Sequence, residues 1–100
     1  MTNFYVTYHC GSKEVRDRFY ADIKANQIGE KSRAEDGCIR YDYFFPADDD
    51  TTIFLWEQWE SREAQKVHTT QPHFPVTGAL KEKHGITTDV LVQAAMESAK

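Results

Sequence analysis

The stretch TTIFLWEQW, residues 51–59, is apolar on both of its faces. Read as a β-strand, it places Ile53, Leu55, Glu57 and Trp59 on one side and Phe54, Trp56 and Gln58 on the other. A strand of an antiparallel sheet that exposes one face to water carries polar residues on that face. Both faces of this strand must therefore be covered by other parts of the structure.

The segments around this strand alternate between strand and helix patterns. Strands are predicted at 3–9, 38–45 and 85–93, and helices at 13–35, 62–70 and 72–84, with Pro72 in the first turn of the last helix. The order β-α-β-β-α-β predicts an α+β, ferredoxin-like fold: a four-stranded antiparallel sheet with its helices on one side. Residues 1–93 form this single domain, and 94–100 form a C-terminal tail that is either helical or loose.

In two of these segments, the spacing of residues predicts which side chains face the interior of the domain. In 38–45, Ile39, Tyr41, Tyr43 and Phe45 are expected to share one face of the strand. In the helix at 13–35, Asn26 and Gln27 continue the apolar stripe onto the inward face. Buried polar groups need partners, which a ligand, water or a frayed helix end could supply.

The second face of the sheet has no cover within one chain, because the helices occupy only the first. An aromatic-rich sheet face left open in this way predicts a homodimer packed sheet against sheet.

Composition excludes several classes of protein. Twelve basic and sixteen acidic residues give a net charge of −4 without a basic cluster, so nucleic-acid binding is not expected. No run approaches the ~20 apolar residues of a membrane span, and the N-terminus has no leader-like pattern, which predicts a cytoplasmic protein. Two cysteines, Cys10 and Cys38, are too few for a disulfide scaffold.

The segment HTTQPHF, residues 68–74, carries two histidines five positions apart. On a helix that spacing separates them by about 140°, and Pro72 interrupts the helix. No cysteine or carboxylate lies nearby at ligand spacing, so no metal is expected.

As a single group, His68 shares the inward face of its helix with Ala64 and Val67. It is either a proton acceptor near neutral pH or a histidine hydrogen-bonded within the core. His73 is expected to be a partly exposed first-turn residue, and His9 and His84 ordinary surface residues.

Glu57 is a carboxylate in phase with Leu55 and Trp59 on a mostly apolar face. It is either an acid–base group with a raised pKa or, by default, the ion-pair partner of Arg40 on the neighbouring strand. Trp59 and Tyr41 offer flat surfaces for a planar ligand, as they would for an ordinary core.

Two long blocks, EDGCIRYDYFF (35–45) and IFLWEQWESREAQKVHTTQPHF (53–74), resemble the central signature of the antibiotic biosynthesis monooxygenase (ABM) family of dimeric α+β barrel proteins. The resemblance implies a homodimer with a pocket between sheet and helices in each subunit. Family members include cofactor-free oxygenases of quinols and polyphenols, haem degraders, and the enzyme that processes phosphorylated autoinducer-2. Gln27 stands where the autoinducer group has a histidine.

The resemblance implies roles for particular residues. His68 is the expected catalytic base and His73 the second candidate. The expected substrate-binding residues are Trp59, Tyr41, Phe74, Asn26, Gln27 and Glu57. Asn3, Trp59 and His68 could take the places of the residues that haem degraders use, but haem is not expected.

Three functions follow as alternatives. The first is a cofactor-independent monooxygenase of a small quinol-like, polyphenolic or enolic substrate, with molecular oxygen as co-substrate. The second is an isomerase of a small phosphorylated signal molecule, which would need cations such as Arg33, Arg40 or Lys66. The third is a ligand-binding dimer without catalysis.

Overall fold

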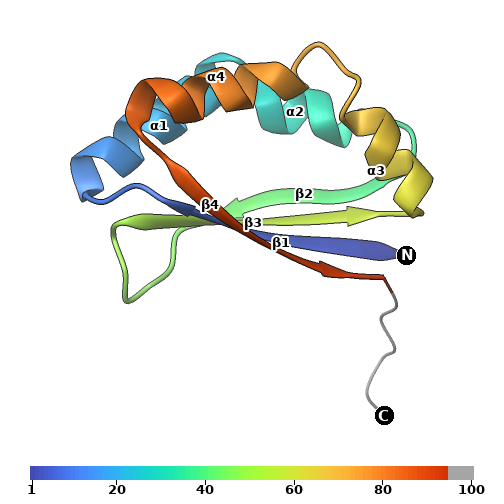
Figure 1. Ribbon diagram of the computed structural model, residues 1–100, viewed down its shortest axis with the longest axis horizontal. Helices are drawn as coiled ribbons and strands as arrows, with labels where there is room; N and C mark the ends of the chain where they lie inside the picture. Colours follow the sequence, from blue (N-terminus) through green and yellow to red (C-terminus); the bar gives the residue numbers. More distant parts are fainter. Residues whose placement is uncertain (95–100) are drawn as a thin grey trace.

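The computed structural model describes residues 1–94 and shows one sheet with all of its helices on the same side (Figure 1). Its elements are β1 (Thr2–His9), α1 (Lys13–Ala25), α2 (Ile28–Arg33), β2 (Cys38–Phe44), β3 (Thr52–Trp59), α3 (Arg62–His68), α4 (Phe74–His84) and β4 (Thr87–Gln93). The expected tail lies outside the described residues from position 95 on. Within residues 1–94, no helix is long and apolar enough to cross a membrane.

The sheet order is β2-β3-β1-β4, and every neighbouring pair is antiparallel. The apolar strand at 52–59 is β3, and it lies inside the sheet next to β1. This arrangement confirms the ferredoxin-like α+β fold. Phe4, Val6 and Tyr8 of β1 face the helices and are buried, as their alternation predicts. They pack with Phe19 and Ile23 of α1, both almost fully buried.

The prediction of a single helix over 13–35 is wrong, because the helix is interrupted at Asn26 and Gln27. Asn26 caps the end of α1, and Gln27 has a left-handed backbone with φ 55°. This turn redirects α2 so that Ile28 becomes buried. Asn26 and Gln27 consequently face solvent, and the prediction that they face inward is also wrong.

A bulge at the start of β2 changes which residues face the helices. Cys38 is opposite Trp59 and Arg40 is opposite Gln58, so Ile39 is the extra residue and is exposed. Phe45 is exposed as well. The predicted face is therefore wrong only for Ile39: Tyr41 and Tyr43 remain on the helix side, and the Phe45 ring packs against Tyr20 and Arg16 of α1.

The bulge also decides the partner of Arg40. Its guanidinium stacks over the Trp56 ring at 4.1 Å and lies 3.4 Å from Asp42 on the outer side of the sheet. Glu57 faces the helices, so the expected Arg40–Glu57 ion pair does not form.

Helix α4 starts later than predicted, and none of its residues is fully buried. It begins at Phe74 with Pro75 in its first turn, while Pro72 lies in the preceding connection. At its other end, Asp22 of α1 accepts hydrogen bonds from Lys83 at 2.9 Å and His84 at 2.7 Å. His84 is thus a mostly buried, paired residue, in contrast to the surface position expected for it.

Gly37 fixes how closely α3 approaches the start of β2. Its φ is +82°, its carbonyl accepts a hydrogen bond from the Glu60 amide at 2.8 Å, and an added Cβ would lie 2.7 Å from the Ala64 Cβ. Gly11 has nearly the same φ, +81°, but has open space around it.

We expect Gly37→Ala to destabilise the fold more than Gly11→Ala. Both substitutions carry the left-handed backbone strain of roughly 1–2 kcal/mol, and the clash at Gly37 adds about 1–3 kcal/mol. Urea unfolding of both variants measures the difference. Equal losses of stability would show that α3 accommodates the methyl group without cost.

Candidate active site

A cavity of about 370 Å³ lies between the helix-facing side of the sheet and helices α3 and α4. Its walls are mainly apolar. Phe4, Val6 and Tyr8 of β1 line it from the sheet, and Phe74 and Pro75 of α4 line it from the other side. His68 and His73 are the imidazole groups that reach it.

His68 is the last residue of α3 and is almost completely buried. Ser61 caps the first turn of this helix by accepting a hydrogen bond from the Ala64 amide at 3.1 Å. Ala64 and His68, four residues apart, then face the sheet, whereas Val67 points outward and is exposed. The His68 ring packs against Trp59, with 4.8 Å between centroids and 38° between the ring planes, and this contact restricts its orientation.

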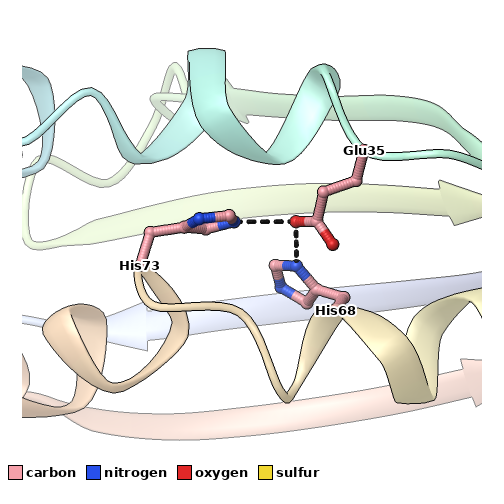
Figure 2. A group of neighbouring side chains, drawn as sticks. All are labelled: Glu35, His68 and His73. Atoms are coloured by element: carbon pink, nitrogen blue, oxygen red, sulfur yellow. Dashed lines mark hydrogen bonds and ion pairs between the residues drawn. The ribbon is translucent and has the colours of Figure 1, made fainter.

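Both histidines of HTTQPHF bind the same carboxylate (Figure 2). His68 Nδ1 lies 2.6 Å and His73 Nε2 lies 2.7 Å from Oε2 of Glu35. Glu35 comes from the connection between α2 and β2, more than thirty residues earlier in the chain. The turn through Pro72 brings His73 back toward His68, so their ring centroids are 5.7 Å apart.

The hydrogen bond to Glu35 determines the tautomer of His68. A carboxylate accepts hydrogen bonds, so the His68 nitrogen facing it, Nδ1, is the donor. In the neutral ring the other nitrogen, Nε2, then carries a free lone pair. This pairing gives an imidazole at the cavity wall that is ready to accept a proton.

Burial lowers the pKa of His68, and the neighbouring His73 lowers it further. The hydrogen bond and negative charge of Glu35 act in the opposite direction, but burial is the largest effect. His68 is therefore neutral at neutral pH, which is the state that a general base requires.

Glu57 lines the same cavity from β3 and is buried. Burial raises its pKa to about 7, although Trp59 Nε1 donates a hydrogen bond to its Oε1 at 3.1 Å. Of the two alternatives for Glu57, the ion pair with Arg40 is therefore wrong; the acid–base role stays a prediction.

This raised pKa predicts a stability that falls as pH rises. The ordinary pKa of the group is 4.5 and the folded value is about 7, so between these values the folded protein binds more protons than the unfolded chain. Below pH 4.5 the protonated Glu57 does not destabilise the folded protein. The free energy of unfolding then falls as pH rises from 4.5 to about 7, where the side chain becomes charged in the folded state as well. In Glu57→Gln this loss should be absent, so above pH 7 the free energy of unfolding of the variant should exceed that of the native protein by up to about 3 kcal/mol.

Urea unfolding from pH 5 to 8 tests this, with the exposed Glu82→Gln as the matched control. The low pKa of His68 acts in the opposite direction, because the folded state resists its protonation as pH falls. That contribution is common to the compared proteins and cancels in their difference. Parallel stability curves for Glu57→Gln and the native protein would contradict the prediction.

The Glu35, His68 and His73 cluster also has the donors of a divalent-cation site. One ligand atom from each lies within 4.8 Å of the other two, and this is the one such group among residues 1–94. The expectation that no carboxylate accompanies the histidines is thus wrong. An ion bound there would displace the protons that now hold both rings to Glu35.

The structure brings together most of the residues expected at the site. His68, His73, Tyr41, Phe74 and Glu57 all line the cavity. Trp59 lies beneath His68, behind the lining. His73 is buried instead of partly exposed because Glu35 holds its ring.

Three expected residues lie elsewhere. Asn26 and Gln27 are exposed and do not line the cavity. Asn3 faces the opposite side of the sheet, where its Oδ1 accepts hydrogen bonds from Trp56 and Gln58. The trio of Asn3, Trp59 and His68 is therefore split between the two faces.

Glu35, Lys81 and Thr88 belong to the cavity region but were not expected there. For Glu35, the available signal was the pair of histidines itself, because buried imidazoles need hydrogen-bond partners. Lys81 and Thr88 gave no signal in the sequence, since they reach the cavity only through the packing of α4 and β4.

Comparison with known proteins places this geometry in a family. The profile of the family described as "Antibiotic biosynthesis monooxygenase" matches residues 12–78, which include Glu35, His68 and His73. The chain belongs to this family. The resemblance of the two sequence blocks quoted above is thereby confirmed.

Relatives with similar sequences come from Bacillus subtilis (strain 168). "Putative monooxygenase YcnE" is 33% identical over 61 residues, covering 61% of this chain and 62% of that protein. "Uncharacterized protein YjcS" is 36% identical over 47 residues, covering 47% of this chain and 45% of that protein. The matches thus span less than two thirds of either relative.

Solved structures share the whole fold. Rv0793 from Mycobacterium tuberculosis is 27% identical with a TM-score of 0.80, and all of both chains is covered. A Deinococcus radiodurans structure described as a "putative antibiotic biosynthesis monooxygenase" has a TM-score of 0.84 at 17% identity, covering 100% of this chain and 97% of that one. At that identity the second likeness concerns the fold alone.

Proposed function

We propose that the protein is a cofactor-independent monooxygenase of a small quinol-like, polyphenolic or enolic substrate. The observation that carries this proposal is the His68 imidazole, buried at the wall of an apolar cavity and oriented by Glu35. Membership of the monooxygenase family supports it at the level of reaction class.

The reaction begins with proton removal. A hydroxyl of the bound quinol gives its proton to Nε2 of His68, and Glu35 stabilises the imidazolium that forms. The electron-rich anion then reacts with molecular oxygen, because one-electron transfer from an anion is easier than from the neutral quinol. Recombination forms a carbon–oxygen bond and gives a peroxide.

The atoms and electrons of this reaction balance without a reductant other than the quinol itself. Breaking the O–O bond leaves one oxygen atom on carbon and releases the other as water, with protons supplied by the imidazolium and the ring C–H. One quinol and one O₂ thus give one hydroxyquinone and one water. The apolar walls around Phe4, Val6 and Phe74 keep bulk water from the reactive anion.

Oxygen consumption with a panel of quinols tests this function. We expect one O₂ consumed per quinol, with the same rate before and after treatment of the protein with a strong chelator. Failure of every quinol would contradict the function. A rate lost on chelation and restored by a divalent metal would contradict the cofactor-independent mechanism and assign an ion to Glu35, His68 and His73.

One observation favours an isomerase of a small phosphorylated molecule as the second candidate. His68 could also move a proton in an isomerisation, and Lys81 supplies a cation at the cavity. The cations expected for this function do not line it: Arg33 bonds the Tyr41 carbonyl at 2.7 Å, Arg40 stacks on the outer sheet face, and Lys66 is exposed. Conversion of a phosphorylated sugar without oxygen consumption would favour this candidate.

We also propose that the protein forms a homodimer through the outer face of its sheet. Tyr5, Phe54 and Trp56 adjoin on that face, and Phe44 and Leu91 are exposed beside them. An apolar surface of this kind is typical of an interface. Light scattering should show a dimer for the native chain and a monomer for Phe54→Glu; a folded native monomer would contradict the proposal.

A further inference from the structure

The cavity has a second polar end, away from His68. Phe74, Thr77, Gly78 and Lys81 of α4 all line it, and their spacing of three, four and seven residues places them on one helix face. Phe74 touches His68 with its ring edge at 5.3 Å between centroids. Lys81, two turns further along, therefore lies at the opposite end of that face.

Lys81 and Thr88 meet at this second end because both adjoin Tyr8. Thr88 of β4 is the direct cross-strand partner of Tyr8, and Lys81 Nζ lies 5.9 Å from the centre of the Tyr8 ring. Both residues line the cavity. A cation and a hydroxyl thus lie at one end of a cavity whose walls are mainly apolar.

Within residues 1–94, the Lys81 ammonium contacts the face of the Tyr8 ring but has no anionic partner, and Thr88 lacks a side-chain hydrogen bond. Lys81 makes no ion pair there. Thr88 Oγ1 is buried without a hydrogen-bond partner. A buried hydroxyl left unpaired costs stability, so the position of Thr88 Oγ1 beside a cavity and a lysine without an ion pair points to a ligand that supplies the partner.

The strand register gives the separation of the two ends. Glu57 of β3 pairs with Phe4 of β1 on one side and with Tyr41 of β2 on the other. The Tyr41 ring contacts the His68 ring, with 5.6 Å between centroids, so His68 lies near the level of Phe4 along the sheet. Tyr8 lies four residues beyond Phe4, which is about 13 Å at 3.3 Å per residue. The two ends are thus separated by roughly the reach of two fused aromatic rings with substituents at opposite ends.

We propose that Lys81 and Thr88 form a subsite for an anionic oxygen group, a carboxylate or a phosphate, on an elongated aromatic substrate whose hydroxyl meets His68. The His68 end of this inference rests on the proposed function; the Lys81 end rests on the cavity geometry alone. Burial raises the pKa of Tyr8 well above its usual value, so its hydroxyl stays protonated and adds no repulsive charge.

Binding without turnover tests the subsite separately from catalysis. The probes are a naphthol, the hydroxynaphthoate with its carboxylate at the far end of the rings, and naphthyl phosphate, measured by calorimetry without oxygen. We expect at least ~10-fold tighter binding of one of the anions than of the naphthol, as for a hydrogen bond to a charged group. Comparing carboxylate with phosphate identifies which anion the subsite prefers.

Variants assign the preference to the subsite. Lys81→Gln should reduce it to within about threefold, and Lys81→Arg should retain most of it because the charge remains. Thr88→Val should weaken anion binding a few-fold. Lys66→Gln, which removes an exposed lysine outside the cavity, is the matched control and should change nothing. Circular dichroism of each variant verifies that it is folded.

Three outcomes would overturn the subsite: equal affinity for the neutral and anionic probes, an anion preference that survives in folded Lys81→Gln, or no binding of any probe. A Lys81-dependent preference in a protein that oxidises no quinol would leave the subsite standing and remove the proposed function. Quinol turnover by a protein that shows no anion preference would support the proposed function and remove the subsite.

Discussion

Replacing His68 by alanine is expected to lower kcat for quinol oxidation at least ~100-fold, the usual contribution of a positioned general base. In the proposed reaction the Nε2 lone pair of His68 is the proton acceptor, and no water molecule that replaces the ring could reproduce its basicity. The measurement is the initial rate of oxygen consumption, with the variant's unfolding midpoint recorded in urea.

The control for this variant is His84→Ala. Like His68, His84 is mostly buried and bonded to a carboxylate, Asp22, at 2.7 Å, but it does not line the cavity. It should alter stability while leaving turnover per folded molecule within about twofold. Turnover unchanged in folded His68→Ala would remove this residue from the mechanism and leave the cluster with a structural role.

Replacing Glu35 by glutamine should lower kcat by roughly 10- to 100-fold, the value of a hydrogen bond to a charged group. Glutamine can still accept a hydrogen bond from His68, but it lacks the charge that stabilises the imidazolium. We therefore assign Glu35 as a positioning residue that acts through His68.

The pH profile of Glu35→Gln separates this role from a purely structural one. Glu35 raises the pKa of His68 through its hydrogen bond and its charge. Removing that charge lowers the pKa further, so the base stays deprotonated at lower pH and the acid limb of kcat/KM moves to lower pH.

Glu30→Gln is the matched control for this variant. Glu30 is an exposed carboxylate in the same region, paired with Arg33 at 3.2 Å, and its replacement should move neither kcat nor the acid limb. An acid limb that stays in place in Glu35→Gln would contradict the assignment of His68 as the titrating base.

The fold could be predicted from the sequence because its signals are local. Alternation in 51–59 identifies a strand that is apolar on both faces, and the order of the elements leaves one common topology. The same local signals turn His68 inward, since Ala64 and His68 lie one helical turn apart. These features depend on neighbours within a few positions.

The features that the sequence did not predict depend on contacts between distant residues or on single backbone angles. Glu35 joins the histidines only after α2, β2 and α3 have packed, and no spacing rule connects residues so far apart. The left-handed angle at Gln27 changes which residues face inward after it, and the bulge at Ile39 moves that one side chain off the predicted face. Periodicity assumes an unbroken element, so it cannot anticipate either one.

The two walls of the cavity are held in place very differently. Trp59 and His68 are embedded among buried residues, whereas Phe74, Thr77 and Lys81, which line the cavity from α4, are exposed or half-buried. Exchanges at these three positions would consequently reshape ligand preference with little effect on stability, while exchanges at the opposite wall would threaten folding itself. The side chains that select a ligand are therefore separable from those that hold the fold together.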